Sequence, residues 1–329
     1  MLEALSVLAP MFVILGVGFV AGFFRRFRDG ATGINNFVFT VSLPCFIYIS
    51  IATADLPDSF PWQVWVLALV FPAIFAALVY YGTRLLTPKY EDQAAPLSMT
   101  SSYGNVGYFG IPMTIGLLGP EAAVPAAIVH LLHNLVFLIG YPIMRGNSNR
   151  TPPQTSATVE TARGVQTTLR RIGREIIFRA LLNPVTISTA LGVIVVAFNI
   201  PVPGLIDQSV ELLGATAIPL ALFSVGVAMQ PAFASLRSGG LSLRLVLSGI
   251  GLKNVIFPLA TLALAWAFRH DMGAGWFGTV YLMATMPMST SGYILSERYD
   301  ESGDLAAAVL AGTTILSIVT VPLLAALVT

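Results

Sequence analysis

Long apolar segments fill most of this chain and restrict its possible folds more than any other feature. Of its 329 residues, 56% are hydrophobic and only 10% are charged, and the mean hydropathy is +0.80. A soluble globular domain carries far more polar surface than this composition supplies. Because about 20 apolar residues cross the hydrocarbon core of a bilayer, the segments correspond to about ten crossings. We therefore expect an all-α polytopic membrane protein.

The expected spans leave only one long loop, at residues 145–180. Residues 151–162 are rich in Pro, Thr and Ser, which indicates a linker. The apolar residues that follow recur on one helical face among five arginines, which predicts an amphipathic helix on an anionic membrane surface; an ordinary solvated linker helix is the alternative. The ten expected spans are 4–24, 33–53, 62–86, 94–119, 121–144, 181–199, 206–229, 242–268, 275–298 and 303–328.

Positive charge predicts how the chain crosses the membrane. Of the 17 Lys and Arg residues, 15 lie in loops that follow odd-numbered spans, which the positive-inside rule places in the cytoplasm. The long loop then lies in the cytoplasm, and both termini lie outside. These 15 residues are Arg25, Arg26, Arg28, Arg84, Lys89, Arg145, Arg150, Arg163, Arg170, Arg171, Arg174, Arg179, Arg237, Arg244 and Arg298.

Proline spacing suggests that the chain contains two related halves. Pro44 in the second span and Pro219 in the seventh are 175 residues apart, and so are Pro112 in the fourth and Pro287 in the ninth. An odd number of spans in each half inverts the second copy relative to the first. We expect a five-plus-five inverted repeat, in which residues 1–144 and 181–329 form the two copies.

The fourth span contains a stretch that interrupts a helix. Gly104, Gly107 and Gly110 remove the side chains that stiffen a helix, and Pro112 removes a backbone donor. We expect helical order to lapse from about Asn105 to Gly110 and to resume near Ile111. A break inside a membrane persists only where protein or a watery cavity satisfies the freed backbone groups, so it indicates a binding site.

Inversion predicts that the broken fourth and ninth spans cross near the middle of the bilayer. Each restarted half-helix carries roughly half a positive charge at its N-terminus, together with unpaired N–H groups. The starts near Gly110 and Met288 would therefore attract an anion, and the opposing carbonyl-rich ends would attract a cation or a proton donor. The second break is expected at Pro287.

These motifs resemble a known family. The run from Gly104 to Pro112, the Leu43-Pro44 pair, the segment from Ala221 to Gly226 and the Met286-Pro287 pair resemble the auxin efflux carrier family, of the bacterial type, within the bile acid:sodium symporter-like superfamily. The resemblance covers nearly the whole chain. It implies a panel (scaffold) domain and a crossover (core) domain, each assembled from both repeats, that move against each other like an elevator.

The resemblance also implies a class of substrate. Plant members of the family export indole-3-acetate, and bacterial relatives are usually assigned dicarboxylates such as malate or malonate. The short hydrophilic loop of this chain matches the bacterial type. Relatives further suggest a homodimer through the scaffold helices. In the family the crossover asparagine is implicated in holding the substrate carboxylate, and here that residue is Asn105.

Spacing suggests further residues near Asn105. We expect Gly110 and Ile111 at one half-helix start, and Met288, Ser289, Thr290 and Ser291 at the other. The three hydroxyls could donate to a carboxylate or coordinate an ion, although Ser and Thr in membrane helices often bond to their own backbone.

Lys253 lies midway along the eighth span, where a charge costs at least ~2.5 to 3.5 kcal/mol. We expect it to reach the crossover, where it would neutralise the anion, titrate, or take the place of a sodium ion. The alternative is that its stem snorkels or its amine pairs with a carbonyl. The neighbouring Asn254 would share the site.

The fifth span carries a polar patch. His130 and His133 share a helix face with a spacing that suits two metal ligands, but no third ligand is evident. Hydrogen bonding between helices and a part in a proton path are the remaining interpretations.

The expected function is secondary transport or uniport of a small organic anion by alternating access, with protons as the candidate coupling ion. An intramembrane enzyme would need catalytic groups at membrane depth, and no aspartate lies mid-span. A receptor without transport is the other alternative. We expect no enzyme activity, cofactor, bound metal or nucleic-acid partner.

Overall fold

The computed structural model describes residues 2–53, 60–146, 182, 184–237, 242–299 and 304–327, and these residues form helices without a strand. The expectation of an all-α polytopic membrane protein is confirmed for them. Of the linker and amphipathic helix expected over 145–180, all but the first two residues lie outside the described residues. The principal helices are α1 (Leu2–Ala21), α2 (Arg25–Phe37), α3 (Leu43–Ala52), α4 (Gln63–Trp65), α5 (Phe71–Leu86), α6 (Ala94–Ser102), α7 (Ile111–Leu118), α8 (Ala123–Gly146), α10 (Pro184–Ala197), α11 (Gly204–Ala215), α12 (Ala217–Arg237), α13 (Leu243–Gly251), α14 (Phe257–Ala267), α15 (Arg269–Met272), α16 (Ala274–Thr285), α17 (Thr290–Tyr299) and α18 (Asp304–Ala325).

Several of these helices join end to end into longer apolar segments. Six of the resulting helices in the described residues are long and apolar enough to cross a membrane, and shorter apolar helices add to them. The six are Arg25–Ala52, Gln63–Leu86, Pro120–Arg145, Gly204–Val227, Leu243–Ala267 and Asp304–Ala325, and the shorter ones are Ala9–Ala21, Val106–Leu118 and Pro184–Ala197.

Four joints between helices contain a π-helical turn, and in each the turn ends two residues before a proline. A proline ring clashes with the carbonyl four residues earlier in an α-helix, and an extra residue in the turn relieves that clash. The residue just before each proline donates its N–H to the carbonyl five residues earlier, so the helix continues instead of breaking. The four turns are Val38–Ser42, Val66–Val70, Val106–Gly110 and Leu252–Ile256, before Pro44, Pro72, Pro112 and Pro258.

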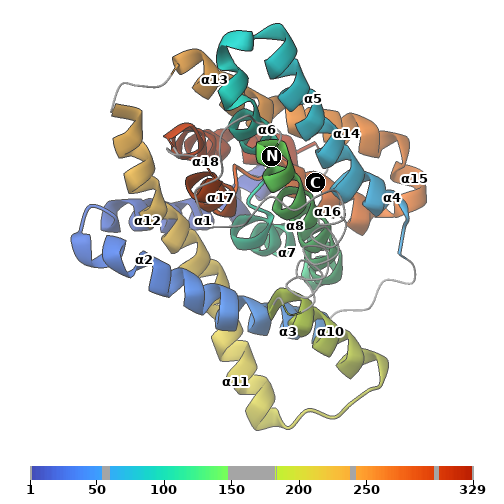
Figure 1. The fold of residues 1–329 in the computed structure, drawn as a ribbon. Coiled ribbons are helices and arrows are strands. Elements are labelled where there is room, and N and C mark those ends of the chain that lie inside the picture. The colour runs from blue at the N-terminus through green and yellow to red at the C-terminus, as the bar shows by residue number, and fades with distance from the viewer. Residues whose placement is uncertain are drawn as a thin grey trace, which may run out of the picture.

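Two helix pairs pack closely through glycine. In the first pair, α1 runs along α12, and a Cβ on Gly226 would lie 2.2 Å from the carbonyl oxygen of Leu15. In the second pair, α10 runs along α3, where Gly192 packs against Ile51 (Figure 1). Small residues allow membrane helices to approach in this way. Both pairs join an early segment of the chain to a later one.

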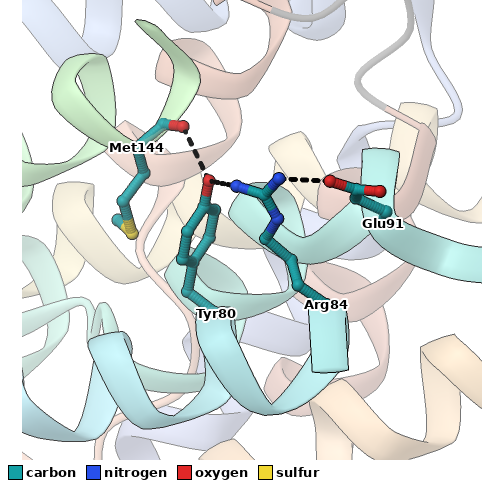
Figure 2. A network of polar contacts seen from close by, with 4 residues as sticks. All are labelled: Tyr80, Arg84, Glu91 and Met144. Carbon is teal, nitrogen blue, oxygen red and sulfur yellow. Dashed lines mark hydrogen bonds and ion pairs between the residues drawn. The ribbon is translucent and has the colours of Figure 1, made fainter. Parts of the chain in front are cut away.

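Helices α6, α7, α16 and α17 lie in the middle of the fold (Figure 1). Helix α6 packs on α5 and α13, and α16 packs on α8, α14 and α18. Ser98 in α6 donates a hydrogen bond of 2.6 Å to the carbonyl oxygen of Ala76 in α5. At the far end of α5, Arg84 donates to the hydroxyl of Tyr80 and pairs with Glu91, and Tyr80 donates to the carbonyl oxygen of Met144 in α8 (Figure 2). These contacts tie α6 and α8 to α5.

The first break is shorter and earlier than the sequence suggested. Only Tyr103, Gly104 and Asn105 leave the helix, and order resumes at Val106 as a π-helical turn. Gly107 and Gly110 lie within that turn, and Pro112 lies in the first turn of α7. Helical order lapses at Asn105, as expected, but our expectation was wrong for Val106 to Gly110, because the π turn keeps the backbone hydrogen-bonded up to the proline.

The second break covers Met286 to Ser289, between α16 and α17. Pro287 lies within this break, as expected, whereas Pro112 lies beyond the first one. Pro112 and Pro287 therefore lie at different places relative to the two breaks.

Candidate functional site at the helix crossover

The two breaks meet as a short antiparallel pair. Gly104 lies opposite Met288. The N–H of Asn105 donates to the carbonyl oxygen of Pro287 at 2.8 Å, and the N–H of Ser289 donates to the carbonyl oxygen of Tyr103 at 2.9 Å. Each break thus satisfies part of the other's backbone, which a membrane interior requires. The expectation that these two segments meet is confirmed.

Side chains from two further helices complete the crossover. The N–H of Gly104 donates to Nε2 of His133 in α8 at 3.1 Å, and the N–H of Met288 donates to Oγ1 of Thr313 in α18 at 3.1 Å. Both donors are buried, so a missing partner would be costly. The sequence interpretation of His133 as an interhelical hydrogen-bonding residue is confirmed. Thr313 was missed, because a threonine in an apolar helix ordinarily bonds only to its own backbone.

Lys253 reaches the crossover. Its side chain is fully buried, and a Cβ on Gly104 would lie 3.4 Å from Nζ. Nζ donates to the carbonyl oxygen of Ala284 at 3.0 Å and lies 4.7 Å from the centre of the Phe257 ring. Ala284 belongs to the last turn of α16, whose free carbonyls carry partial negative charge. The amine of Lys253 thus lies at the carbonyl end of this half-helix, where a positive charge is favoured, and it also pairs with a carbonyl.

Asn105 precedes the restarted helix without capping it. Its side chain is 2% exposed, and its Nδ2 has no hydrogen-bond partner among the described residues. The first backbone N–H groups of a helix also lack acceptors within the helix, and here they belong to Val106, Gly107 and Tyr108. Unpaired N–H groups therefore gather at this one point of the crossover.

Gly110 and Ile111 do not begin the half-helix, contrary to our expectation. Gly110 closes the π turn by donating its N–H to the carbonyl oxygen of Asn105 at 2.9 Å. Ile111 is fully buried in an apolar cluster with Val106 and Met283. Both residues therefore lie behind the helix start, which is one turn earlier, at the buried residues Asn105 and Val106.

The second half-helix start differs from the first because it is capped from within. Oγ of Ser289 accepts a hydrogen bond from the N–H of Ser291 at 3.2 Å, as an N-cap residue does. Thr290 is the first residue of α17, and the Met288 side chain is buried against Leu97 and the start of α18. Ser289 bonds to its own backbone, which is the alternative that the sequence left open.

Asn254 and His130 lie next to the crossover without touching the broken backbone pair. Nδ2 of Asn254 donates to the carbonyl oxygen of Thr313 at 2.9 Å, so Asn254 holds α18. The ring of His130 covers Gly107, where a Cβ would lie 2.8 Å from it, and bonds to Asn134 at 3.0 Å. Asn134 in turn accepts a hydrogen bond from the hydroxyl of Tyr103. In the described part of the chain, no three His, Cys, Asp or Glu residues are placed to hold a metal ion.

Comparison with known proteins gives one family. The model of the family described as "Membrane transport protein", the auxin efflux carrier family, matches residues 4–325. The resemblance noted from the motifs is therefore confirmed over nearly the whole chain.

Curated relatives carry transporter names. A "Putative malonate transporter" of Rhizobium meliloti (strain 1021) is 26% identical over 335 residues, which cover 98% of this chain and 94% of that protein. An "Uncharacterized transporter" of Methanothermobacter thermautotrophicus is 25% identical and covers 90% of this chain and 88% of its own length. "Uncharacterized transporter YfdV" of Escherichia coli (strain K12) is 20% identical, with coverages of 96% and 95%. The chain is thus similar to transporters along its whole length.

Proposed function

The chain belongs to the membrane transport protein family, and from that premise we propose that it carries a small organic anion across the bilayer, as a secondary transporter or uniporter, with a carboxylate bound at the crossover. The observation that carries this proposal is Lys253. Its amine is fully buried beside Gly104, and no Asp or Glu is buried among the residues whose burial is described. An ammonium group in that position lacks a counter-charge, and an anionic substrate would supply one.

The donors near Lys253 support a carboxylate as the group that binds. Asn105 offers an unbonded Nδ2, and the half-helix that begins at Val106 offers free N–H groups and the positive end of its dipole. The other half-helix start is occupied by the hydroxyl of Ser289. We therefore place the carboxylate at Asn105 rather than at the stretch from Met288 to Ser291.

A short dicarboxylate fits this arrangement best. Asn105 follows Gly104 directly in the chain, and the amine of Lys253 lies against Gly104. The Asn105 amide and the Lys253 amine are therefore both beside the first break. One carboxylate would take the Asn105 amide and the helix start, and the second would face Lys253. The relative from Rhizobium meliloti named for malonate makes malonate the first substrate to test, before malate and monocarboxylates.

We further propose ten crossings arranged as a five-plus-five inverted repeat, with residues 1–144 and 181–329 as the copies. The hydrogen bond from Asn105 N–H to the Pro287 oxygen is matched by the one from Ser289 N–H to the Tyr103 oxygen, as expected for an approximate two-fold axis that passes between Gly104 and Met288. The pairing of α1 with α12 likewise mirrors that of α10 with α3. These four helices would form the scaffold, and the helices around the breaks would form the core.

Alternating access would then be a movement of the core against the scaffold, as in an elevator. The charge distribution favours an orientation with both termini outside a bacterial inner membrane and residues 145–180 in the cytoplasm. Lys253 would take the place of a sodium ion, which leaves protons as the coupling ion or makes the protein a uniporter. A homodimer would form through the scaffold.

An intramembrane enzyme and a receptor without transport are the alternatives. The enzyme is disfavoured because the buried polar residues at the crossover include no carboxylate to act as an acid or base. A receptor would bind the anion without moving it across the membrane, so uptake into sealed vesicles distinguishes a receptor from a transporter.

The first experiment is a thermal-stability screen of the purified protein with malonate, malate, acetate and indole-3-acetate, with and without sodium, at two pH values. A ligand at a hundred times its Kd contributes ~2.7 kcal/mol of stability. We expect a shift with a dicarboxylate that does not depend on sodium. Binding that requires sodium would contradict the role assigned to Lys253, and no shift with any anion would contradict the substrate class.

A further inference from the structure

A groove of about 420 Å³ lies on the outside of the helix bundle, away from the crossover. Its walls come from α5 and the start of α13, and its floor comes from Leu97 in α6. The lining is mostly apolar, with Leu78, Val79 and Leu252 among the residues that form it. Leu78 is 67% exposed, so the wall faces the surroundings rather than the core. Gly82 also lines the groove, and a Cβ placed there would meet no atom within 4 Å.

Cationic groups lie at one end of this groove. Arg244 lines it in the first turn of α13, and Tyr90 lines it from the opposite side. Nζ of Lys89 lies 5.7 Å from the centre of the Tyr90 ring. The hydroxyl of Tyr90 lies 3.2 Å from that of Ser242, two residues before Arg244.

Arg244 and Lys89 differ from the nearby Arg84 in having no acidic partner. Arg84 is held by Glu91 and Tyr80, as Figure 2 shows. Within the described ranges no carboxylate lies within ion-pair distance of Arg244 or Lys89. The backbone N–H groups at the start of α13 add partial positive charge beside Arg244. The apolar groove therefore has one cation without an acidic partner in its lining, Arg244, and a second, Lys89, over the ring of the lining residue Tyr90.

We propose that this groove binds an anionic glycerophospholipid, with an acyl chain along α5 and α13 and the phosphate at Arg244 and Lys89. The apolar walls match a hydrocarbon chain, and the two cations match a phosphate with a further anionic or neutral headgroup. A free phosphate would use the cations but leave the apolar length of the groove empty. A zwitterionic lipid would fill the groove but bring its own positive charge close to Arg244.

The lipid would lie against the part of the fold that holds the crossover. Leu97 belongs to α6, the half-helix that ends at the first break, and packs with Met288 in one apolar cluster. Leu252 is adjacent to Lys253 in the chain. A lipid in the groove would thus contact both α6 and the π-helical turn that carries Lys253, and it would stabilise the arrangement seen here.

The test is a titration of the purified full-length protein with phosphatidylglycerol and with phosphatidylcholine of the same acyl chains, read by native mass spectrometry. Inorganic phosphate and glycerol 3-phosphate form separate arms. The charge variant is the double substitution Lys89→Gln with Arg244→Gln. Its matched control is Arg26→Gln with Arg28→Gln, which removes two exposed arginines of α2 outside the groove. The filling variant is Gly82→Leu, and its control is Gly16→Leu in α1, where a Cβ also meets no atom.

We expect the wild type to bind phosphatidylglycerol more tightly than phosphatidylcholine. Each Lys or Arg near an anionic lipid contributes enough for the charge variant to weaken phosphatidylglycerol binding about 30-fold, to the level of phosphatidylcholine. Gly82→Leu should weaken both lipids, and both controls should behave as the wild type. Equal binding of the two lipids by the wild type would overturn the proposal, as would an equal loss in the α2 control. Binding of glycerol 3-phosphate as tight as that of the lipid would show that the groove contributes nothing, and would also overturn it.

Discussion

Gly104 and Met288 lie opposite each other where two interrupted helices cross, and each donates its own N–H to a side chain of a third helix. His133 accepts from Gly104, and Thr313 accepts from Met288. The interrupted helices cannot supply acceptors for these two N–H groups themselves, and no water is available in a bilayer core. The crossover is therefore a structure of four segments, and the stability of the breaks depends on α8 and α18.

Replacing Thr313 with Val should destabilise the protein. Valine keeps the shape of threonine but leaves the buried N–H of Met288 without an acceptor, which costs about 1 to 3 kcal/mol. The neighbouring Thr314→Val is the matched control, because Thr314 is equally buried and its hydroxyl bonds only to the carbonyl oxygen of Leu310 in its own helix. Thermal unfolding in detergent should show a lower Tm for Thr313→Val than for Thr314→Val. Equal Tm values would show that the Met288 bond contributes nothing.

Replacing Asn105 with Ala should weaken substrate binding without unfolding the protein. The variant removes the unbonded Nδ2, and a hydrogen bond to a charged group contributes about 1.5 to 3 kcal/mol, so malonate should bind roughly 10- to 100-fold more weakly. Asn36→Ala, at an exposed position of α2, is the control. Calorimetric titration of malonate measures the effect. Unchanged affinity in a monodisperse Asn105→Ala protein would remove Asn105 from the site.

Replacing Lys253 with Met should abolish the pH dependence of transport. Methionine fills a similar volume, and exchanging a buried charge for an apolar side chain is often neutral for folding. An ammonium group loses its charge as the pH rises, so anion transport by the wild type should weaken toward alkaline pH, and the variant should be slow at every pH. The measurement is initial uptake rate against pH in proteoliposomes. A Lys253→Met profile that follows the wild type would reduce Lys253 to a structural role.

The contact between α1 and α12 should tolerate no side chain at Gly226. A Cβ there would lie 2.2 Å from the carbonyl oxygen of Leu15, and overpacking of this kind costs about 1 to 3 kcal/mol or more. Gly16→Ala, on α1 with no atom within 4 Å of the new Cβ, should be neutral or slightly stabilising. Size-exclusion profiles and Tm values in detergent compare the two. A normal Tm for Gly226→Ala would mean that the two helices are further apart than described here.

The sequence predicted the fold class and the presence of the first helix break, because both depend on local chemistry. Apolar length predicts spans, and the glycines around Asn105 predict a break. The position of Lys253 at mid-span predicted that its amine reaches the crossover or pairs with a carbonyl. In the structure the amine donates to the carbonyl oxygen of Ala284.

Other features of the site depend on contacts between distant segments, and the sequence did not reveal them. The break ends at Val106 because a π turn accommodates Pro112, which glycine content alone does not indicate. The residue opposite Gly104 is Met288, whereas proline spacing had matched Pro112 to Pro287. Thr313 carries no pattern that separates it from Thr314, and only its place beside Met288 gives it a role.

The most direct test of the central claim is the uptake of radiolabelled malonate into sealed proteoliposomes that contain the wild type, Asn105→Ala or Lys253→Met. We predict saturable uptake by the wild type that does not require sodium, and a loss of at least about tenfold in each variant, since each removes a charge-assisted contact to the carboxylate. Saturable uptake that neither substitution changes would contradict the assignment of the crossover as the binding site.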